Sequence, residues 1–310
     1  MRAVLADAFG GPEVLELLDI DVPEPGPGQV RIAVEAAAVN PVDLATRQGL
    51  MHESGMLDGP PVRFGWDVAG RVDAMGIGVR RLRIGQPVIG LSDRLAAPGK
   101  THADAVVLEE AAVAAVSGDL ESPVAATLPL AGLTALQALD LLDLHPGQSI
   151  LVTGVGGAVG SLTLQLARLR GLRVIAAGRA RDATRASSLG ADAFLESSPR
   201  LAEAVRGVVG GGVDGAVDSA RLNNASLDSV RPRGAHVSLA VLQRPAPLRG
   251  IRSVSVAVAA NWEQLALLGS LAATGALQVE IAETMGLPEA RKAHELLATG
   301  GIRGRVVLQP

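Results

Sequence analysis

The feature that most constrains this chain is a glycine-rich turn within ILVTGVGGAVGSLTLQLARLRGLRVIAAGRARDATR, residues 150–185. An apolar run ends at Thr153, and apolar residues at helical spacing begin near Val159. Glycine in such a turn allows positive φ angles, close approach of a phosphate to backbone N–H groups, and close packing of the helix on the strand. The positive end of the helix adds attraction for the phosphates. A strand, a glycine turn, an amphipathic helix and a second strand, in this order, predict a dinucleotide-binding unit.

The glycines of this turn are spaced as G-x-x-G-x-x-G and depart from the strict G-x-G-x-x-G pattern. Counting from Gly154, Val159 stands where the third glycine of the strict pattern would be. A glycine cluster by itself is also compatible with a purely structural loop. With the flanking strands and helix, we expect the turn to hold the pyrophosphate of the cofactor. The predicted contact residues are Gly154, Gly157, Ala158, Val159 and Gly160.

The residues after the second strand indicate which dinucleotide is bound. An NAD site has a carboxylate about 20 residues after the glycine turn, which holds the ribose 2′-hydroxyl, and we find none there. Instead, Gly178 is followed by Arg179, Arg181 and Arg185, and a guanidinium suits a 2′-phosphate. The sequence therefore favours NADPH over NADH. The alternative is that the arginines, Arg185 above all, form the solvated start of a surface helix.

The pattern of strands and helices changes along the chain. The first 115 or so residues are short Val- and Ile-rich runs broken by glycine and proline, which predicts a mainly β structure. From residue 149 to about 242, strand and helix signals alternate, as is typical of a doubly wound parallel sheet. The tail contains two predicted helices and a final strand. A length of 310 residues suits two domains.

Composition excludes several classes of function. The chain has no cysteine, so disulfides, thiolate metal sites and a cysteine nucleophile are impossible. A net charge of −4 argues against nucleic-acid binding. The N-terminus lacks a signal-like apolar region, and we find no run of about 18 apolar residues free of charge, so we expect a soluble, cytoplasmic protein with no membrane partner. The histidines are scattered, and no pair has the close spacing of a metal motif; they are His52, His102, His145, His236 and His294.

Several segments, in order, resemble the medium-chain dehydrogenase/reductase superfamily, specifically its zinc-free quinone oxidoreductase branch, which includes zeta-crystallin. The segments are VEAAAVNPVDLATRQG, GWDVAGRV, LPLAGLTALQAL, GQSILVTGVGGAVGSLTLQLA and EARKAHELLATGGIRGRVVL. The resemblance implies an α/β protein with a mainly β, GroES-like catalytic domain formed by residues 1–120 and 258–310. A Rossmann domain, residues 121–257, is inserted between them. The resemblance also implies a cleft between the domains and a homodimer formed through the edge strands of the Rossmann sheets.

The same resemblance accounts for the absence of metal ligands. Zinc-dependent relatives carry Cys, His and Cys at positions that here hold Asn40, Trp66 and Ala131. We therefore expect a metal-free reductase that passes hydride from NADPH to a small hydrophobic quinone or conjugated enone. Two alternatives remain open: a non-catalytic NADPH-binding redox sensor, and a tailoring enoyl or quinone reductase of aromatic natural-product biosynthesis.

By family position, Asn40 is the first candidate for a polar group that faces the nicotinamide and the substrate. Asp43 is a weaker candidate, and it equally suits the cap of a helix that starts near Leu44. Thr127 and Thr134 resemble residues that line the cofactor site, although a structural hydroxyl is nearly as good an interpretation.

Two further departures from the family concern the cofactor pocket and the proton donor. Ser219, Ala220 and Arg221 replace a Gly-rich turn of the family, and Ser219 and Leu239 are further expected cofactor contacts. Some relatives use a Tyr as proton donor, and this chain has none. His52 could act as the general acid instead, or be an exposed loop histidine. Without a donor, solvent would protonate the product, which is easier for a quinone than for a carbanion.

Overall fold

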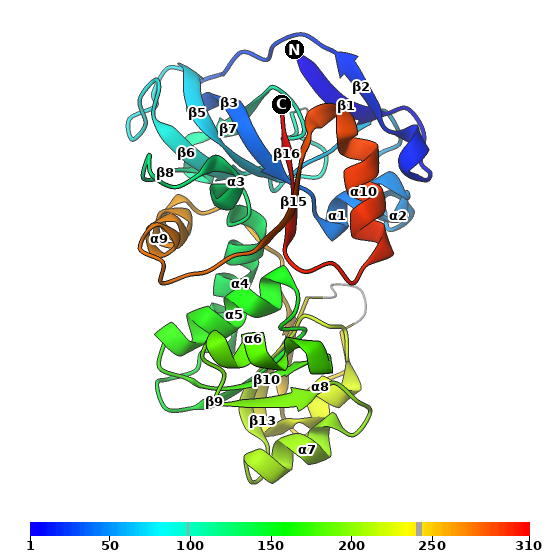
Figure 1. Ribbon diagram of the computed structural model, residues 1–310, viewed down its shortest axis with the longest axis vertical. Helices are drawn as coiled ribbons and strands as arrows, with labels where there is room; N and C mark the ends of the chain where they lie inside the picture. The colour runs from blue at the N-terminus through cyan, green and yellow to red at the C-terminus, as the bar shows by residue number, and fades with distance from the viewer. Residues whose placement is uncertain (98, 240–243) are drawn as a thin grey trace. The chain divides into compact units, whose positions relative to one another are not determined.

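The computed structural model describes residues 1–97, 99–239 and 244–310, which form two compact units (Figure 1). Unit 1 comprises Met1–Leu133 and Ala259–Pro310, and unit 2 comprises Thr134–Val258. The first boundary thus lies within helix α4 (Pro129–Leu142), later than the 120/121 boundary expected from sequence. The reason is that the first turn of α4 bonds to unit 1, since the backbone N–H of Leu130 donates to the Asp67 carboxylate at 2.5 Å. The second boundary, at 258/259, differs from the expected 257/258 by one residue.

Unit 2 contains a six-stranded sheet in the order β11-β10-β9-β12-β13-β14, and every neighbouring pair is parallel. This confirms the doubly wound sheet predicted from the alternating pattern. The short helix before β13 ends at Asp228, because the chain is extended from Val230. The elements are β9 (Ser149–Thr153), α5 (Ala158–Leu169), β10 (Arg173–Gly178), η3 (Ala180–Asp182), α6 (Ala183–Ser188), β11 (Ala193–Glu196), α7 (Leu201–Val208), β12 (Val213–Asp218), α8 (Asn224–Asp228), β13 (Val230–Ser238) and β14 (Arg252–Ser255).

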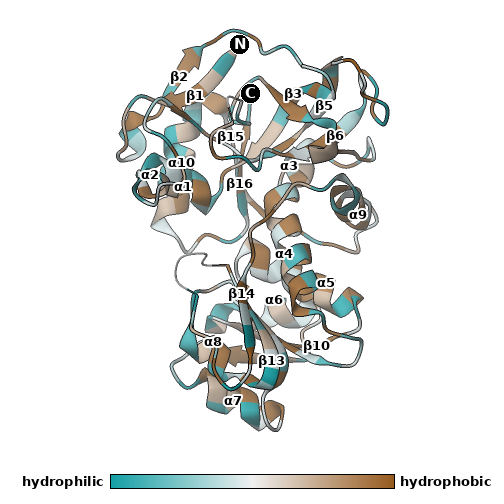
Figure 2. Cartoon of the chain, turned by 180° about the vertical axis from the view of Figure 1, so that it is seen from behind, coloured by the Kyte–Doolittle hydropathy of each residue, from teal (hydrophilic) through white to brown (hydrophobic). Residues whose placement is uncertain are grey.

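The sheet of unit 2 is buried along its central strands, as a parallel sheet with helices on its faces must be. All five residues of β9 are buried, and its neighbours contribute apolar side chains to one core. Figure 2 shows apolar and polar residues side by side on α5, as expected of a helix with one face on a sheet. This core includes residues of β9 and β12, and the candidate cofactor contacts Gly154 and Ser219 follow directly after these two strands.

Unit 1 is built from two sheets. A three-stranded sheet has the order β2-β1-β4, and a seven-stranded sheet has the order β15-β16-β3-β5-β6-β8 with β7 also paired to β3. The mainly β structure predicted for this part is confirmed, whereas strand β15 was not expected. The strands are β1 (Arg2–Ala6), β2 (Glu16–Asp19), β3 (Gln29–Ala38), β4 (Val62–Arg63), β5 (Asp67–Met75), β6 (Pro87–Leu91), β7 (Ala105–Glu109), β8 (Val113–Ala115), β15 (Ile281–Gly286) and β16 (Arg305–Gln309). The helices are η1 (Pro12–Val14), α1 (Pro41–Arg47), α2 (Leu50–Glu53), η2 (Glu110–Ala112), α3 (Ser122–Ala125), α9 (Trp262–Ala273), η4 (Leu287–Glu289) and α10 (Ala290–Thr299).

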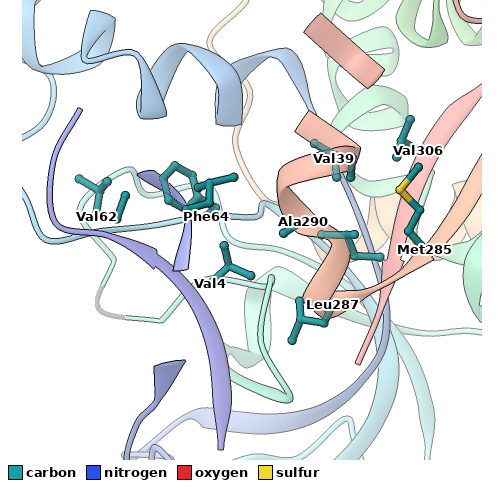
Figure 3. Close-up of a cluster of buried hydrophobic side chains, with 12 residues drawn as sticks. Val4, Val39, Val62, Phe64, Met285, Leu287, Ala290 and Val306 are labelled. Carbon is teal, nitrogen blue, oxygen red and sulfur yellow. The ribbon is translucent and has the colours of Figure 1, made fainter. Parts of the chain in front are cut away.

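The tail of the chain is part of the core of unit 1. Strand β16 pairs antiparallel with β3, and the two lie side by side in Figure 1. Figure 3 shows a buried cluster in which residues of the first strand and of the segment before β5 pack against the tail. Its labelled members are Val4, Val39, Val62, Phe64, Met285, Leu287, Ala290 and Val306. Burial of this apolar surface fixes the tail to the N-terminal part.

One helical stretch, Ser122–Leu142, is long and apolar enough to cross a membrane by length and composition, and 72% of its most apolar window is buried inside the protein. This corrects the expectation from sequence that the chain has no run of about 18 apolar residues free of charge. Burial to this extent is typical of a helix that packs in a protein core.

Candidate nucleotide site and candidate active site

The glycine turn after β9 is too tightly packed to accept side chains at its key positions. Gly154 has a φ of +67°, and a Cβ there would lie 2.7 Å from Ser219 Oγ. A Cβ on Gly160 would lie 2.3 Å from the carbonyl oxygen of Gly154, which means that α5 packs directly on the turn. Gly157 precedes α5 and has no side chain to cap its first N–H groups, at Ala158 to Gly160. A bare backbone cradle at the positive end of a helix fits a pyrophosphate.

The turn lies where the strand order of the sheet reverses. Strands β9 and β12 are neighbours, and the chain leaves their carboxyl ends at Gly154 and Ser219 in opposite directions across the sheet. Open parallel sheets bind their ligands in the crevice at this switch point. Leu239 follows β13 and donates its N–H to the Asp218 carbonyl oxygen at 3.2 Å, so it also lies at this edge.

A buried carboxylate shapes the turn that replaces the family's glycine-rich segment. Asp218 accepts from Thr153 Oγ1 at 2.7 Å and from the N–H groups of Leu222 and Asn223 at 3.0 and 2.7 Å. Arg221 and Asn223 have φ angles of +57° and +51°. The left-handed conformations that glycine would supply are therefore adopted by residues with side chains. The bonds to Asp218 hold them in place.

The end of β10 holds a carboxylate that was overlooked in the sequence. Asp182 accepts from the N–H of Arg179 at 2.9 Å. A Cβ on Gly156 would lie 2.6 Å from Asp182 Oδ1, and one on Gly178 would lie 3.0 Å from Oδ2. An acidic group therefore lies against the glycine turn, about 20 residues after it in the chain, which corrects the expectation that no carboxylate is present there. Arg179 and Arg181 are exposed and flank this carboxylate in the chain, whereas Arg185 is half-buried on α6.

In unit 1, the amide of Asn40 is fully occupied by the protein. Its Nδ2 donates to Asp67 Oδ2 at 2.7 Å and to the Ala38 carbonyl oxygen at 3.2 Å, and its Oδ1 accepts from Arg305 at 2.8 Å. Arg305 also bonds to Asp67 at 3.1 Å. Burial raises the pKa of Asp67 to about 6, although Arg305 and Asn40 act in the opposite direction. Asn40 is 2% exposed, so this network leaves it no donor for a substrate.

The other candidates from sequence also have structural partners. Asp43 accepts from the N–H of Asn40 and that of Gly65, both at 2.8 Å, and so caps α1, which begins at Pro41 rather than near Leu44. Thr127 is buried and donates to the Val124 carbonyl oxygen at 2.7 Å.

The last two candidates are placed differently. His52 is exposed on α2, contacts the Leu57 carbonyl oxygen at 3.0 Å, and stacks on Phe9. Thr134 is the first residue of unit 2 and is half-buried within α4.

The three segments that carry zinc ligands in zinc-dependent relatives meet in unit 1. Asp67, next to Trp66, bonds both to Asn40 and to the N–H of Leu130, which precedes Ala131. Amide, indole and methyl side chains supply no ligand set for zinc at these positions. Across residues 1–97, 99–239 and 244–310, no group of three or more His, Asp or Glu side chains is arranged to hold a metal ion.

The structure adds one charged residue to this region. Lys100 is 5% exposed, and its ammonium lies 4.4 Å from the centroid of the Trp66 ring. A signal was present in the sequence, because of the 28 Lys and Arg residues only Lys100 and Lys292 are lysines. In a chain that uses arginine almost everywhere else, a lysine is a candidate titratable group, because its pKa shifts readily on burial whereas an arginine stays charged.

Comparisons with known proteins agree with this architecture. Residues 26–118 match the alcohol dehydrogenase GroES-like domain, and residues 189–308 match the zinc-binding dehydrogenase family. The chain is 30% identical to a quinone oxidoreductase of Pseudomonas aeruginosa, with 98% of each chain covered. It is 31% identical to a 2-methylene-furan-3-one reductase of Solanum lycopersicum, over 100% of this chain and 79% of the relative. A mycobacterial protein solved in complex with NADPH superimposes with a TM-score of 0.86 at 28% identity, with full coverage of both chains.

Proposed function

The chain belongs to the quinone oxidoreductase family of the medium-chain dehydrogenase/reductase superfamily, and from this premise we propose that it transfers hydride from NADPH to a quinone or a conjugated enone without a metal ion. It is an oxidoreductase of the quinone and enone reductase kind. The observation that carries the proposal is the bare glycine cradle at the switch point of a parallel sheet, which fits the pyrophosphate of a dinucleotide.

When bound, the reduced nicotinamide supplies the hydride, and the protein supplies binding and orientation. We assign the pyrophosphate to the backbone of Gly154, Gly157, Ala158, Val159 and Gly160, with Ser219 and Leu239 beside it. Thr127 and Thr134 remain proposed contacts of the cofactor. We infer that Asn40 and Asp43 shape the active site through their internal bonds, because their polar atoms are already engaged.

The first experiment follows absorbance at the NADPH band with a naphthoquinone, a benzoquinone and a conjugated enone side by side. Consumption with a quinone or the enone would support the reductase. Tight NADPH binding with no turnover of any acceptor would contradict it and favour a redox sensor. Dialysis against a chelator should leave activity unchanged, because the positions of the zinc ligands hold Asn40, Trp66 and Ala131. Activity that is lost on dialysis and restored by zinc would refute the metal-free proposal.

We propose that Arg179 and Arg181 select the 2′-phosphate, with Arg185 as a further candidate. The double variant Arg179→Ala/Arg181→Ala should raise the Kd for NADPH and leave that for NADH little changed, because a guanidinium pairs with the 2′-phosphate that NADH lacks. Titration of each cofactor by fluorescence gives both values. Equal losses for the two cofactors would refute the assignment.

We also propose a cytoplasmic homodimer formed through β14. This strand is at the edge of the six-stranded sheet, and an edge strand offers unpaired backbone groups to a second copy. Light scattering coupled to gel filtration measures the mass, and a proline at Val254 within β14 should shift it from dimer to monomer. A monomeric wild-type protein would contradict this proposal.

A further inference from the structure

Lys100 is the buried one of the two lysines in this chain. Lys292, the other, is on the surface and pairs with Glu289 at 3.3 Å. Lys100 is almost inaccessible, and in the described residues its ammonium donates a single hydrogen bond, to the Ser92 carbonyl oxygen at 3.1 Å. An ammonium carries three donors, so two remain for another acceptor. A buried cation without a carboxylate in hydrogen-bonding contact is costly, which makes a purely structural role a poor explanation.

Close packing of two segments places Lys100 on Trp66. The N–H of His102 donates to the Phe64 carbonyl oxygen at 3.0 Å. Gly65 has a φ of +98°, and a Cβ there would lie 2.5 Å from the backbone nitrogen of His102. The segment before β5 and the segment before β7 are therefore pressed together. The lysine stem is fixed there, with its ammonium over the Trp66 ring.

The surroundings of Lys100 favour a group that gives up its proton near neutral pH. Burial lowers the pKa of Lys100 from 10.5 to about 8, while Asp43 on α1 and Asp93 after β6 act in the opposite direction. His102 is the other titratable neighbour, and the charge of Lys100 contributes to its lowered pKa. An ammonium in this range is far more acidic than an ordinary lysine and can exchange its proton with a developing oxyanion.

We propose that Lys100 is a catalytic residue that binds the carbonyl oxygen of the acceptor and protonates the reduced product. The proposal rests on the proposed function and deepens it, because it supplies the proton donor that a chain without tyrosine lacks. Asn40 cannot take this role, since both of its amide N–H groups are used internally. The ammonium of Lys100 lies over the ring of Trp66. Trp66 directly precedes Asp67, which joins the segments of Asn40 and Leu130 through its hydrogen bonds.

The step balances as follows. Hydride taken from NADPH adds to the β-carbon of an enone, where it forms one C–H bond and leaves an enolate. With a quinone it adds to one oxygen, where it forms one O–H bond and leaves a hydroquinone monoanion. The ammonium of Lys100 stabilises this anion by hydrogen bonding. One N–H bond of Lys100 then breaks as the proton passes to the oxygen or the α-carbon of the anion, and Lys100 becomes a neutral amine. Solvent returns a proton to the amine, so each turnover consumes one NADPH and one proton.

The experiment exploits the two lysines. Protein labelled with 13C at the lysine Cε gives two side-chain signals, and the Lys292→Arg variant identifies that of Lys100. The titration of each signal is followed with and without 4-nitrophenol, whose phenolate mimics the oxyanion. Lys100 should titrate near pH 8, and phenolate should shift its signal and raise its pKa, because the anion stabilises the ammonium. Lys292 should be unaffected by the phenolate.

Kinetics complete the test. Lys100→Met should lower kcat for the enone by about 100-fold or more, as expected when a general acid is removed. Lys100→Arg should retain binding of the phenolate but lose the fall in enone turnover above about pH 8, because a guanidinium keeps its proton. Lys292→Met is the matched control and should behave as wild type.

Three results would overturn the proposal: a Lys100 signal insensitive to phenolate, a wild-type pH profile in Lys100→Arg, or unchanged enone turnover in Lys100→Met. If Lys100→Met does not fold, the response of the Lys100 13C signal to phenolate in the wild-type protein still tests the proposal. A failure of the proposed function is recognised separately, because the wild-type protein would then consume no NADPH with any acceptor.

Discussion

A buried histidine should make unit 1 sensitive to mild acid. His294 on α10 is 0% exposed, neither of its ring nitrogens has a hydrogen-bond partner among the described residues, and its ring lies edge-on to those of Phe64 and His102. Burial, followed by the nearby charges of His102 and Arg47, lowers the pKa of His294 to about 2. The folded protein therefore holds this imidazole neutral at pH values where an unfolded chain would protonate it.

The direction of the effect follows from proton uptake. Because the folded pKa is below the unfolded value of 6.5, the unfolded state binds more protons between the two. The neutral His294 therefore contributes its full share of stability above about pH 6.5, and this contribution is lost as the pH falls below that value. At about 1.4 kcal/mol for each pH unit, His294 alone should remove about 2 kcal/mol from the free energy of unfolding between pH 7 and pH 5.

The assay is urea unfolding followed by tryptophan fluorescence at pH 7 and pH 5. Both tryptophans, Trp66 and Trp262, are in unit 1, so the signal reports the unit that contains His294. His294→Leu keeps a similar side-chain volume and removes the titrating ring. It should reduce the acid-induced loss by about 2 kcal/mol. The exposed His52→Leu is the control and should preserve the wild-type loss. If His294→Leu loses as much stability as wild type between the two pH values, the reasoning is refuted.

Three other predictions follow from the same contacts. Gly160→Ala should cost about 1–3 kcal/mol of stability and raise the Kd for NADPH about tenfold or more, since its Cβ would meet the Gly154 carbonyl oxygen at 2.3 Å. Gly157→Ala is the control for stability alone and should be close to wild type in urea unfolding, because its Cβ would lie 3.4 Å from the same oxygen and its φ is −94°. Asp182→Asn keeps an acceptor for the Arg179 N–H but removes about 1 kcal/mol of repulsion between the carboxylate and the 2′-phosphate of NADPH. The affinity for NADPH should therefore rise about fivefold relative to that for NADH in binding assays, and equal changes for the two cofactors would contradict this. Arg305→Met should lower the free energy of unfolding by about 3–5 kcal/mol, because it leaves the buried Asp67 without its cation. This loss should be larger at pH 8 than at pH 5.5, because a protonated Asp67 needs no cation. A loss of stability that is independent of pH would argue against this role.

The nucleotide-binding unit could be predicted from sequence because its signals are local. The strand, the glycine turn and the helix follow one another within about 20 residues, and each has its own periodicity or backbone requirement. The bounds of α5 and β9 accordingly agree with the predicted elements to within one or two residues. Strand β15 was not predicted, because three of its six residues are exposed and its apolar pattern is short.

The candidate active site was harder to predict because its contacts join distant parts of the chain. Asn40 was the first candidate for a substrate contact, but Arg305, 265 residues away, occupies its oxygen. The position of Asp182 against Gly156 depends on how the chain turns after β10, and the spacing of charges in the sequence does not reveal that turn. Lys100 could not be predicted as a site residue, because no sequence motif contains it. What distinguishes it is burial on Trp66, which only the fold supplies.

The discontinuity of unit 1 has a consequence for biosynthesis. Unit 2 is continuous, so all of its strands have left the ribosome well before residues 305–309 are made. Unit 1 cannot complete its fold until these residues are made, because β16 pairs with β3 and Arg305 neutralises Asp67. The N-terminal strands therefore spend most of translation with an unpaired edge and an uncompensated buried acid. This is the interval in which a nascent chain is most exposed to mispairing and most in need of a chaperone.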